Sequence, residues 1–359
     1  MLFNHNQTGH WRGKTALATA LGALGALASQ AHADDVTLPP ISIGAGMEAS
    51  YFHCDTSCLY NGSGTGDLDG FALNSARLYI NGSVTDTIKM TFNTEYTSEN
   101  NLEVMDAIAR FELSPELNIW AGRFLPPVDR ANLYGPYYAN DWTPYADGVA
   151  DYYPNVAVGR DNGIAYWGDF GPVKASFGLF DGQSLNSAVD DPTKLLYAGR
   201  VMVDLWDKES GYYLNGTYYG DKDLLAFGVA AQSQDSKTTW SADGLLEKKL
   251  GDAGAITVEA EYNKDNGLTG ATHSDGWYGL VAYVFPQVVG VGKFQPLVKY
   301  SEKTYDATTS FKVKTTEVNF NYIIKAFNAR VGLYYLTEKA SPSSGSTPSE
   351  AGLKLQIQM

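Results

Sequence analysis

Hydrophobic and polar side chains alternate along most of the chain after residue 33. Residues 256–263 read ITVEAEYN, residues 317–322 read EVNFNY and residues 353–359 read LKLQIQM, with apolar side chains at every second position. This period of two predicts β-strands with one apolar and one polar face. Because no run of 18 apolar residues follows residue 33, the pattern excludes a bundle of transmembrane helices.

Short turns and longer polar loops separate these segments in a regular order. Short turns are expected near residues 85–87, 114–116, 169–172, 251–254, 287–292 and 325–328, with a longer one at 207–223. Loops are expected near residues 53–69, 97–101, 125–161, 181–194, 234–238, 264–275, 301–310 and 338–350. These connections imply sixteen antiparallel strands with both termini on one side. Residues 211–220 (GYYLNGTYYG) could form a further strand, which would change the count.

A soluble β-sandwich would show the same alternation, so the choice between the two folds depends on other features. Long loops alternate with short turns, and aromatic residues such as Trp120, Trp167, Tyr262, Trp277 and Tyr335 recur near strand ends. Both features are typical of outer-membrane proteins. The sequence therefore predicts an all-β fold, a transmembrane antiparallel β-barrel of about sixteen strands.

The first residues have the layout of a secretory signal peptide. Arg12 and Lys14 precede an uncharged, Ala- and Leu-rich run over residues 15–30, and Ala31-His32-Ala33 forms a cleavage signal. A transmembrane anchor needs about 20 strongly apolar residues, which this run lacks. We expect a cleaved leader over residues 1–33 and one barrel domain over residues 34–359.

Composition and charge exclude several functions. The chain of 359 residues has 40 Asp and Glu against 26 Lys and Arg, a net charge of −14, which argues against nucleic-acid binding. Two Cys cannot form a disulfide scaffold or a four-cysteine metal centre. After removal of the leader only His53 and His273 remain, and neither lies in a nucleophile motif. We therefore expect no enzyme, no cofactor and no metal.

The two cysteines lie close together in the first loop. Cys54 and Cys58 are four residues apart in a segment that faces an oxidising compartment, which favours a local disulfide. The alternative is metal binding together with His53 and Asp55, but a single imidazole makes this a poor metal site.

Alternation also predicts which charged side chains face the lumen. The expected inward bases are Arg77, Lys89, Arg110, Lys174, Arg200, Lys299, Arg330 and Lys354. The expected inward acids are Glu95, Asp106, Glu112, Asp204, Glu259, Glu261 and Glu317. The two sets nearly balance, so most of the negative charge is expected in loops and turns. These side chains either are solvated wall residues without a role in selectivity or form a transverse field that orients solutes.

Several segments carry a resemblance to a known family: residues 76–82 (ARLYING), 106–113 (DAIARFEL), 117–127 (LNIWAGRFLPP) and 220–228 (GDKDLLAFG). With the short hydrophobic last strand, they resemble bacterial porins, most closely the phosphate-selective porin O/P family. The resemblance implies a homotrimer of sixteen-stranded barrels in the outer membrane, in contact with lipid and lipopolysaccharide, with anion preference. The acidic charge departs from this family, as does Met359, since such barrels usually end in Phe.

The loop over residues 125–161 is the longest connection and the main functional candidate. The resemblance implies that this third loop folds into the barrel and narrows it. The expected constriction residues are Asp129, Arg130, Asp141, Asp147, Asp151, Arg160 and Asp161. The alternative is that its many aromatic residues form a trimer contact or an external cap.

The functional hypothesis is a porin, a water-filled channel for passive diffusion of small hydrophilic solutes and ions. The resemblance indicates phosphate or other anions, whereas the net charge indicates general ions. The alternative is a secreted or surface β-rich adhesin or carbohydrate-binding protein without channel activity.

Overall fold

A computed structural model describes residues 40–61, 66–96, 101–149, 159–182, 194–268, 273–306, 310–342 and 347–359. Sixteen strands form the wall of a closed barrel. Their bounds are β1 Ile41–Asp55, β2 Leu68–Ser83, β3 Ile88–Tyr96, β4 Leu102–Ser114, β5 Leu117–Phe124, β6 Asp161–Phe170, β7 Val173–Phe180, β8 Leu196–Asp204, β9 Leu224–Gln234, β10 Lys237–Lys249, β11 Ala255–Asp265, β12 His273–Val284, β13 Lys293–Asp306, β14 Phe311–Lys325, β15 Ala329–Ser341 and β16 Ser349–Gln358. The predicted all-β fold and the strand number are confirmed.

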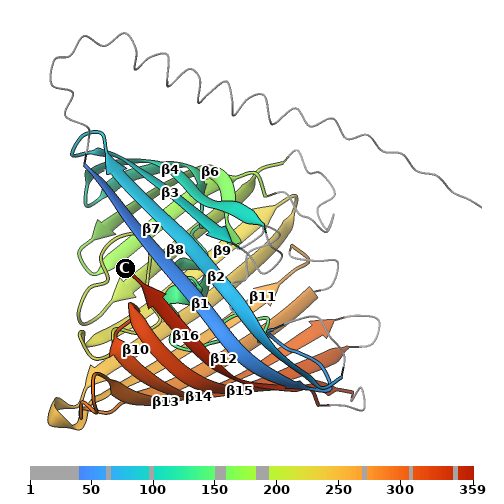
Figure 1. Cartoon of the computed structure of the whole chain (residues 1–359). Coiled ribbons are helices and arrows are strands. Elements are labelled where there is room, and N and C mark those ends of the chain that lie inside the picture. Colours follow the sequence, from blue (N-terminus) through green and yellow to red (C-terminus); the bar gives the residue numbers. More distant parts are fainter. Residues whose placement is uncertain are drawn as a thin grey trace, which may run out of the picture. The chain divides into compact units, whose positions relative to one another are not determined.

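Every strand pairs in antiparallel fashion with its neighbours in the sequence, and the last strand closes the ring on the first. In the closing pair, Gly46 of β1 lies opposite Gln358 of β16 (Figure 1). The start of β1 and the end of β16 therefore lie at the same end of the barrel. We call this the terminal end, and the opposite end the loop end.

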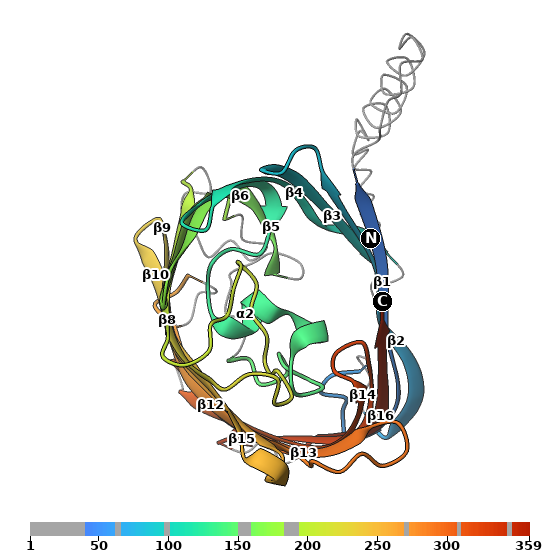
Figure 2. The same cartoon turned by 90° about the vertical axis from the view of Figure 1, so that its left-hand side faces the viewer.

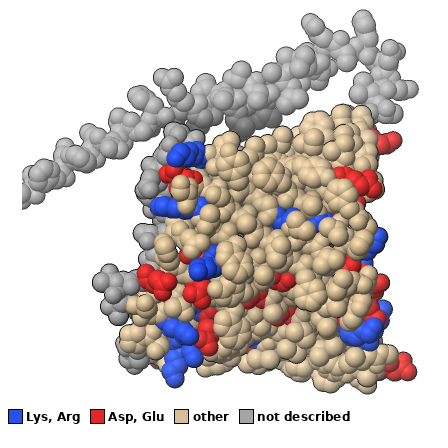
Figure 3. All heavy atoms as spheres, turned by 180° about the vertical axis from the view of Figure 1, so that it is seen from behind, with Lys and Arg blue, Asp and Glu red and all other residues tan. Residues whose placement is uncertain are grey.

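Alternation along each strand separates an apolar outer face from a polar inner face. In β16, Leu353 and Ile357 are exposed on the outside, while Lys354 and Gln356 are buried inside. On the side seen in Figure 3, uncharged side chains cover most of the wall, and charged ones gather toward the two ends. This arrangement suits a barrel with lipid outside and polar groups inside.

The connections follow the predicted order, with short turns at the terminal end and longer loops at the loop end. Two connections depart from this rule: residues 205–223 form a long connection at the terminal end, as expected, and residues 235–236 form a two-residue turn at the loop end. Residues 211–220 lie within the long connection and do not form a strand. In the described part of the chain no helix is long and apolar enough to cross a membrane.

Candidate functional site

The third loop, residues 125–160, turns into the barrel directly after β5. Its helix α2 (Arg130–Tyr134) is buried throughout, and a 3₁₀ turn, η1 (Pro136–Tyr138), follows. Asp129 caps α2, since its carboxylate accepts from the Asn132 N–H at 2.8 Å. Viewed along the axis, α2 lies inside the ring of strands (Figure 2).

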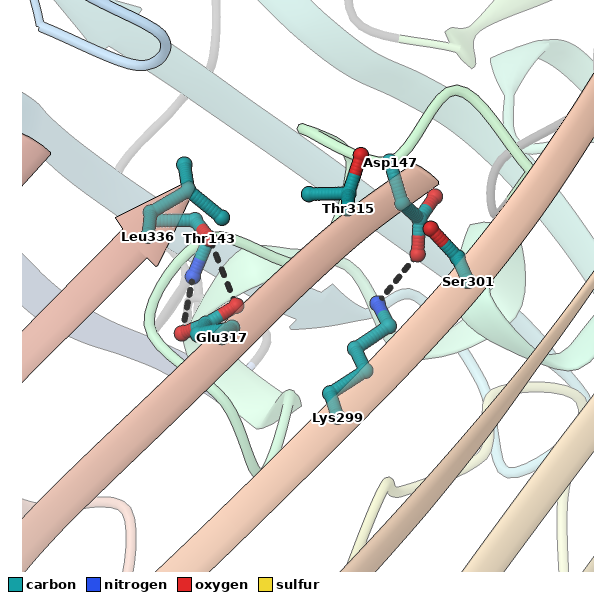
Figure 4. Close-up of a pocket in the computed structure, with 7 residues that line it drawn as sticks. All are labelled: Thr143, Asp147, Lys299, Ser301, Thr315, Glu317 and Leu336. Carbon is teal, nitrogen blue, oxygen red and sulfur yellow. Dashed lines mark hydrogen bonds and ion pairs between the residues drawn. The ribbon is translucent and has the colours of Figure 1, made fainter. Parts of the chain in front are cut away.

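Lys299 of β13 holds the described return segment of this loop, residues 139–149, through several contacts. The Lys299 ammonium lies 3.0 Å from Asp141 Oδ2 and 2.7 Å from Asp147 Oδ2. It also donates to the Pro144 carbonyl at 2.9 Å. All three charged side chains are buried, so the loop is fixed to the wall by charge-assisted hydrogen bonds. Figure 4 shows the contact between Lys299 and Asp147.

Further contacts from β14, β15 and β16 fix the same segment. The Glu317 carboxylate accepts from the Trp142 N–H at 3.0 Å, the Thr143 N–H at 3.2 Å and the Thr143 hydroxyl at 2.6 Å. The Arg330 guanidinium covers the Trp142 ring, with 4.1 Å to the ring centre. The Lys354 ammonium donates to the Trp142 carbonyl at 3.0 Å. The return segment is therefore part of the inner wall.

A second segment enters the barrel from the terminal end. It is the β8–β9 connection, residues 205–223, and it meets the third loop in the interior. The Arg130 guanidinium donates to Glu209 Oε1 at 3.0 Å, and both side chains are almost fully buried. The Tyr212 hydroxyl donates to the Leu125 carbonyl at 2.7 Å. The two inner segments thus contact each other inside the barrel.

The ionisation of this contact follows from its geometry. Burial acts to raise the pKa of Glu209, but the charge and hydrogen bonds of Arg130 outweigh it and leave this pKa below its ordinary value. Burial acts to lower the pKa of Arg130, but Glu209 and the neighbouring acids raise it. Both groups are therefore charged at neutral pH. Burial also raises the pKa of Tyr212, which stays a neutral phenol.

One side of the interior is apolar. The inner faces of β4 to β10 form a hydrophobic cluster with side chains of both inner segments. Its members from these segments are Leu125, Val128, Leu133, Tyr212 and Leu214. Trp120, Phe124, Trp167 and Phe180 contribute wall aromatics, with the Trp120 and Tyr212 ring centres 4.6 Å apart. The inner segments therefore cannot leave without exposing apolar surface to water.

A chamber of about 590 Å³ lies beside β1 to β4. Its lining combines wall residues with parts of both inner segments. They are Ser42, Ile43, Gly44, Arg77, Tyr79, Asn81, Thr91, Asn93, Met105, Asp106, Arg110, Leu125, Leu133, Tyr134, Tyr138, Arg160, Tyr213, Leu214, Asn215, Ala326, Phe327, Asn328, Gln358 and Met359. Ser42, at the start of β1, and Gln358, at the end of β16, are among them, so the chamber reaches the terminal end.

Two of the chamber's arginines are paired with buried acids. Arg77 makes two hydrogen bonds with Glu95, at 3.0 and 3.1 Å. The Arg160 Nε donates to Asp106 Oδ1 at 3.3 Å.

The third arginine is only partly satisfied. The nearest charge to Arg110 is Glu112, with 3.5 Å between Nη1 and Oε1. The Arg110 Nε has no hydrogen-bond partner among the described residues. Each of the three arginines thus has an acidic neighbour, and within the described part of the chain Arg110 keeps one donor without a partner. The chamber can therefore offer hydrogen-bond donors to an anion.

The structure places the expected lumen-wall residues as follows. Inside and buried are Arg77, Glu95, Asp106, Lys174, Arg200, Glu259 and Glu261, and half-buried are Lys89 and Arg110. The expectation of a nearly balanced wall is wrong. The alternation along the strands had not identified five further buried acids and one further buried base. The acids are Glu48, Asp243, Glu247, Asp265 and Glu350, and the base is Lys303. Asp265, Lys303 and Glu350 lie in segments expected to be loops, because β11, β13 and β16 extend further than expected. Glu48, Asp243 and Glu247 lie inside expected strands whose inner face the sequence pattern did not reveal.

The expected constriction residues do not gather at one place. Arg160 lines the chamber. Asp129 caps α2, while Arg130, Asp141 and Asp147 are engaged in the buried ion pairs described above. Asp161 begins β6 and accepts from the Gly182 N–H at 2.7 Å. Asp151 lies outside the described residues, and a constriction by this set stays a prediction.

Sequence reasoning missed the β8–β9 connection as part of the interior. Its only signal was residues 211–220, rich in Gly and Tyr, which were interpreted as a turn or a strand. Tyr213 and Asn215 from this stretch line the chamber. A long, aromatic connection at the end with otherwise short turns is the feature that could have revealed it.

The first loop carries a disulfide. Cys54 and Cys58 are bonded, with 5.0 Å between their Cα atoms. Glu350 lies beside them but accepts from the N–H groups of Leu59 and Tyr60, at 3.0 and 2.8 Å. His53 instead lies 3.1 Å from Asp69. The cysteines are therefore placed as a covalent link in the loop and do not act as thiolate ligands.

Comparisons with known proteins bear on the fold. No protein-family model and no curated protein sequence matches the chain. Among solved structures, an anion-selective porin from Comamonas acidovorans matches with 13% identity and a TM-score of 0.60, over 89% of this chain and 99% of that one. The outer membrane channel DcaP of Acinetobacter baumannii matches with 13% identity and a TM-score of 0.57, over 92% and 100%. OmpF of Salmonella typhi, in complex with daunomycin, matches with 14% identity and a TM-score of 0.54, over 89% and 98%. The chain shares the sixteen-stranded barrel fold of these porin structures.

Proposed function

We propose that this chain is a porin of the bacterial outer membrane, exported through the periplasm after removal of residues 1–33. The observation that carries the proposal is an arginine-lined chamber of about 590 Å³ inside a closed barrel with an apolar outer face. A barrel of this kind satisfies its backbone groups in lipid and leaves polar groups for solutes inside. Its function is passive diffusion of small hydrophilic solutes and ions, without covalent chemistry.

The chamber lining supports a preference for anions. Arg77, Arg110 and Arg160 project into it, and Arg110 has the least complete set of partners. One Arg guanidinium can donate hydrogen bonds to two oxygens of a carboxylate or phosphate, so these side chains favour small anions over cations. The likeness to an anion-selective porin of another organism agrees with this preference. Phosphate is the solute that the sequence resemblance suggests.

The same resemblance supports a homotrimer surrounded by lipid and lipopolysaccharide. Exposed apolar side chains on the outer face, such as Phe71, Val201, Val229 and Leu333, provide surface for lipid or for a neighbouring barrel. Chemical cross-linking of the protein in detergent measures the subunit number, for which three is expected.

Planar-bilayer recording with purified protein tests the function. In a gradient of potassium chloride we expect the current to increase in steps as single channels insert. The sign of the reversal potential should show that chloride is more permeant than potassium. A gel establishes that the preparation is folded, because a folded barrel migrates faster in the unheated sample than the unfolded chain does in the heated sample. Folded protein without channels would refute the porin and favour an adhesin or a carbohydrate-binding protein.

A further inference from the structure

The β8–β9 connection, residues 205–223, is fixed in its inward position from both sides. The Lys174 ammonium donates to the carbonyls of Glu209 and Gly211, each at 2.6 Å. On the other side, the Glu247 carboxylate accepts from the Tyr218 N–H at 2.8 Å and the Thr217 hydroxyl at 2.7 Å. Buried charges that each make several hydrogen bonds, whether they donate or accept them, position a segment well. Hydrogen bonds from both walls therefore fix the connection inside the barrel.

The tip of this connection presents one aromatic side chain to the chamber. Tyr212 and Leu214 are buried in the hydrophobic cluster, whereas Tyr213 between them is 38% exposed. Its ring packs on Trp120, with 5.5 Å between ring centres. Gly211 precedes the tip with φ of 87°, a conformation that other residues rarely adopt. The turn at Gly211 and the packing on Trp120 thus fix where Tyr213 points.

Tyr213 lies among the chamber's charged groups. Tyr213 shares the chamber lining with Asp106, Arg110 and Arg160. Because the connection starts and ends at the terminal end, a solute that enters there meets Tyr213 together with Arg110 and Arg160. An aromatic ring at that place limits size, while the two guanidinium groups select charge.

We propose that the β8–β9 connection narrows the chamber together with the third loop, and that Tyr213 is its specificity-determining residue. This inference rests on the proposed channel function. Tyr213 narrows the chamber beside Arg110 and Arg160, so that small anions of the size of phosphate or a short carboxylate pass more readily than larger ones.

The first experiment compares Tyr213→Ala with the parent protein in planar bilayers and in liposome-swelling assays with anions of graded size. We expect conductance to rise by about twofold and the size limit to move upward, because the ring is removed from the passage. Tyr213→Phe keeps the ring, so its size limit should match that of the parent. Tyr197→Ala, on the outer face of β8, is the matched control and should change neither property.

A second variant keeps the test decisive if the alanine protein folds poorly. In Tyr213→Cys, the new thiol is the only free one expected, since Cys54 and Cys58 are bonded. A negatively charged thiosulfonate reagent added to the terminal side should reduce the current, and faster than a positively charged one, because two arginines flank the site.

The outcomes separate the two proposals. A folded parent protein without channels refutes the porin itself. A conducting parent whose Tyr213→Ala variant keeps the same conductance and size limit overturns the role of Tyr213. So does a Tyr213→Cys channel that the reagents leave unchanged.

Discussion

Arg130 and Glu209 form a buried ion pair between two segments that enter the barrel from opposite ends. The Arg130 Nη1 lies 3.0 Å from Glu209 Oε1, and each side chain is 1% exposed. The pair joins the third loop to the β8–β9 connection. Breaking it should therefore loosen both inner segments while the wall stays closed.

Glu209→Gln tests this contact. Removing one partner of a buried ion pair costs about 3–5 kcal/mol, and the loss should lie toward the lower value here because Asp243 Oδ1 remains 4.0 Å from the Arg130 Nε. We expect the folded form to unfold at lower urea concentration, measured as loss of the fast-migrating form on unheated gels. Asp223→Asn, in an exposed pair with Lys248, is the control and should have little effect. Equal loss in both variants would contradict a special role for the buried pair.

The same contact predicts a dependence of stability on pH. Because the pKa of Glu209 is lower in the folded protein than in the unfolded chain, its contribution is complete above the unfolded value, about 4.3. The contribution is lost as pH falls through the lower, folded value. The stability difference between parent and Glu209→Gln, measured by urea unfolding, should thus shrink as the pH falls below about 4. A difference that stays constant down to pH 2 would show that the charge of Glu209 contributes nothing.

Lys299 fixes the return segment of the third loop. Lys299→Met leaves Asp141 and Asp147 buried without their shared cation, at a cost of about 3–5 kcal/mol. We expect lower stability and larger current fluctuations in single-channel records, because residues 139–149 lose their contacts with Lys299 and keep only those with the other wall residues. Lys312→Met removes a half-exposed lysine that pairs with Glu302, and its records should resemble those of the parent.

The chamber arginines predict charge selectivity. Arg110→Gln and Arg160→Gln each remove a positive charge from the lining, so the reversal potential in a salt gradient should move toward the cation side. Arg123→Gln is the matched control, since Arg123 donates to the Val104 carbonyl at 3.0 Å and does not line the chamber. A shift of the same size in the control would refute selection by the chamber.

The disulfide should matter locally. Replacement of Cys54 and Cys58 by serine opens a very small ring, so the free energy of unfolding should fall by no more than about 2 kcal/mol. Thiol titration of unfolded, unreduced parent protein should find no free cysteine. Two free thiols would contradict the bond, and a much larger loss of stability would contradict its local role.

The sequence by itself determined the wall of this protein. Apolar and polar residues alternate with a period of two, which indicates the side of each strand that faces lipid. Residues 353–359 therefore already predicted that Lys354 and Gln356 are buried and that Leu353 and Ile357 are exposed. Turn and loop signals are equally local, and they defined the sixteen strands and their antiparallel order. The inward positions of Arg77, Arg200 and Glu259 follow from the same rule.

Only the tertiary structure decided what fills the barrel. Arg130 meets Glu209 across 79 positions of sequence, and Lys299 meets Asp141 across 158. Such partners are chosen by where two segments lie across the lumen, and no periodicity along the chain encodes that position. Asp129, Asp141 and Asp147 of the third loop are therefore engaged with Lys299 or backbone groups. The arginines that line the chamber are Arg77, Arg110 and Arg160. The tip with Tyr213 points inward because Lys174 and Glu247 hold it from two walls.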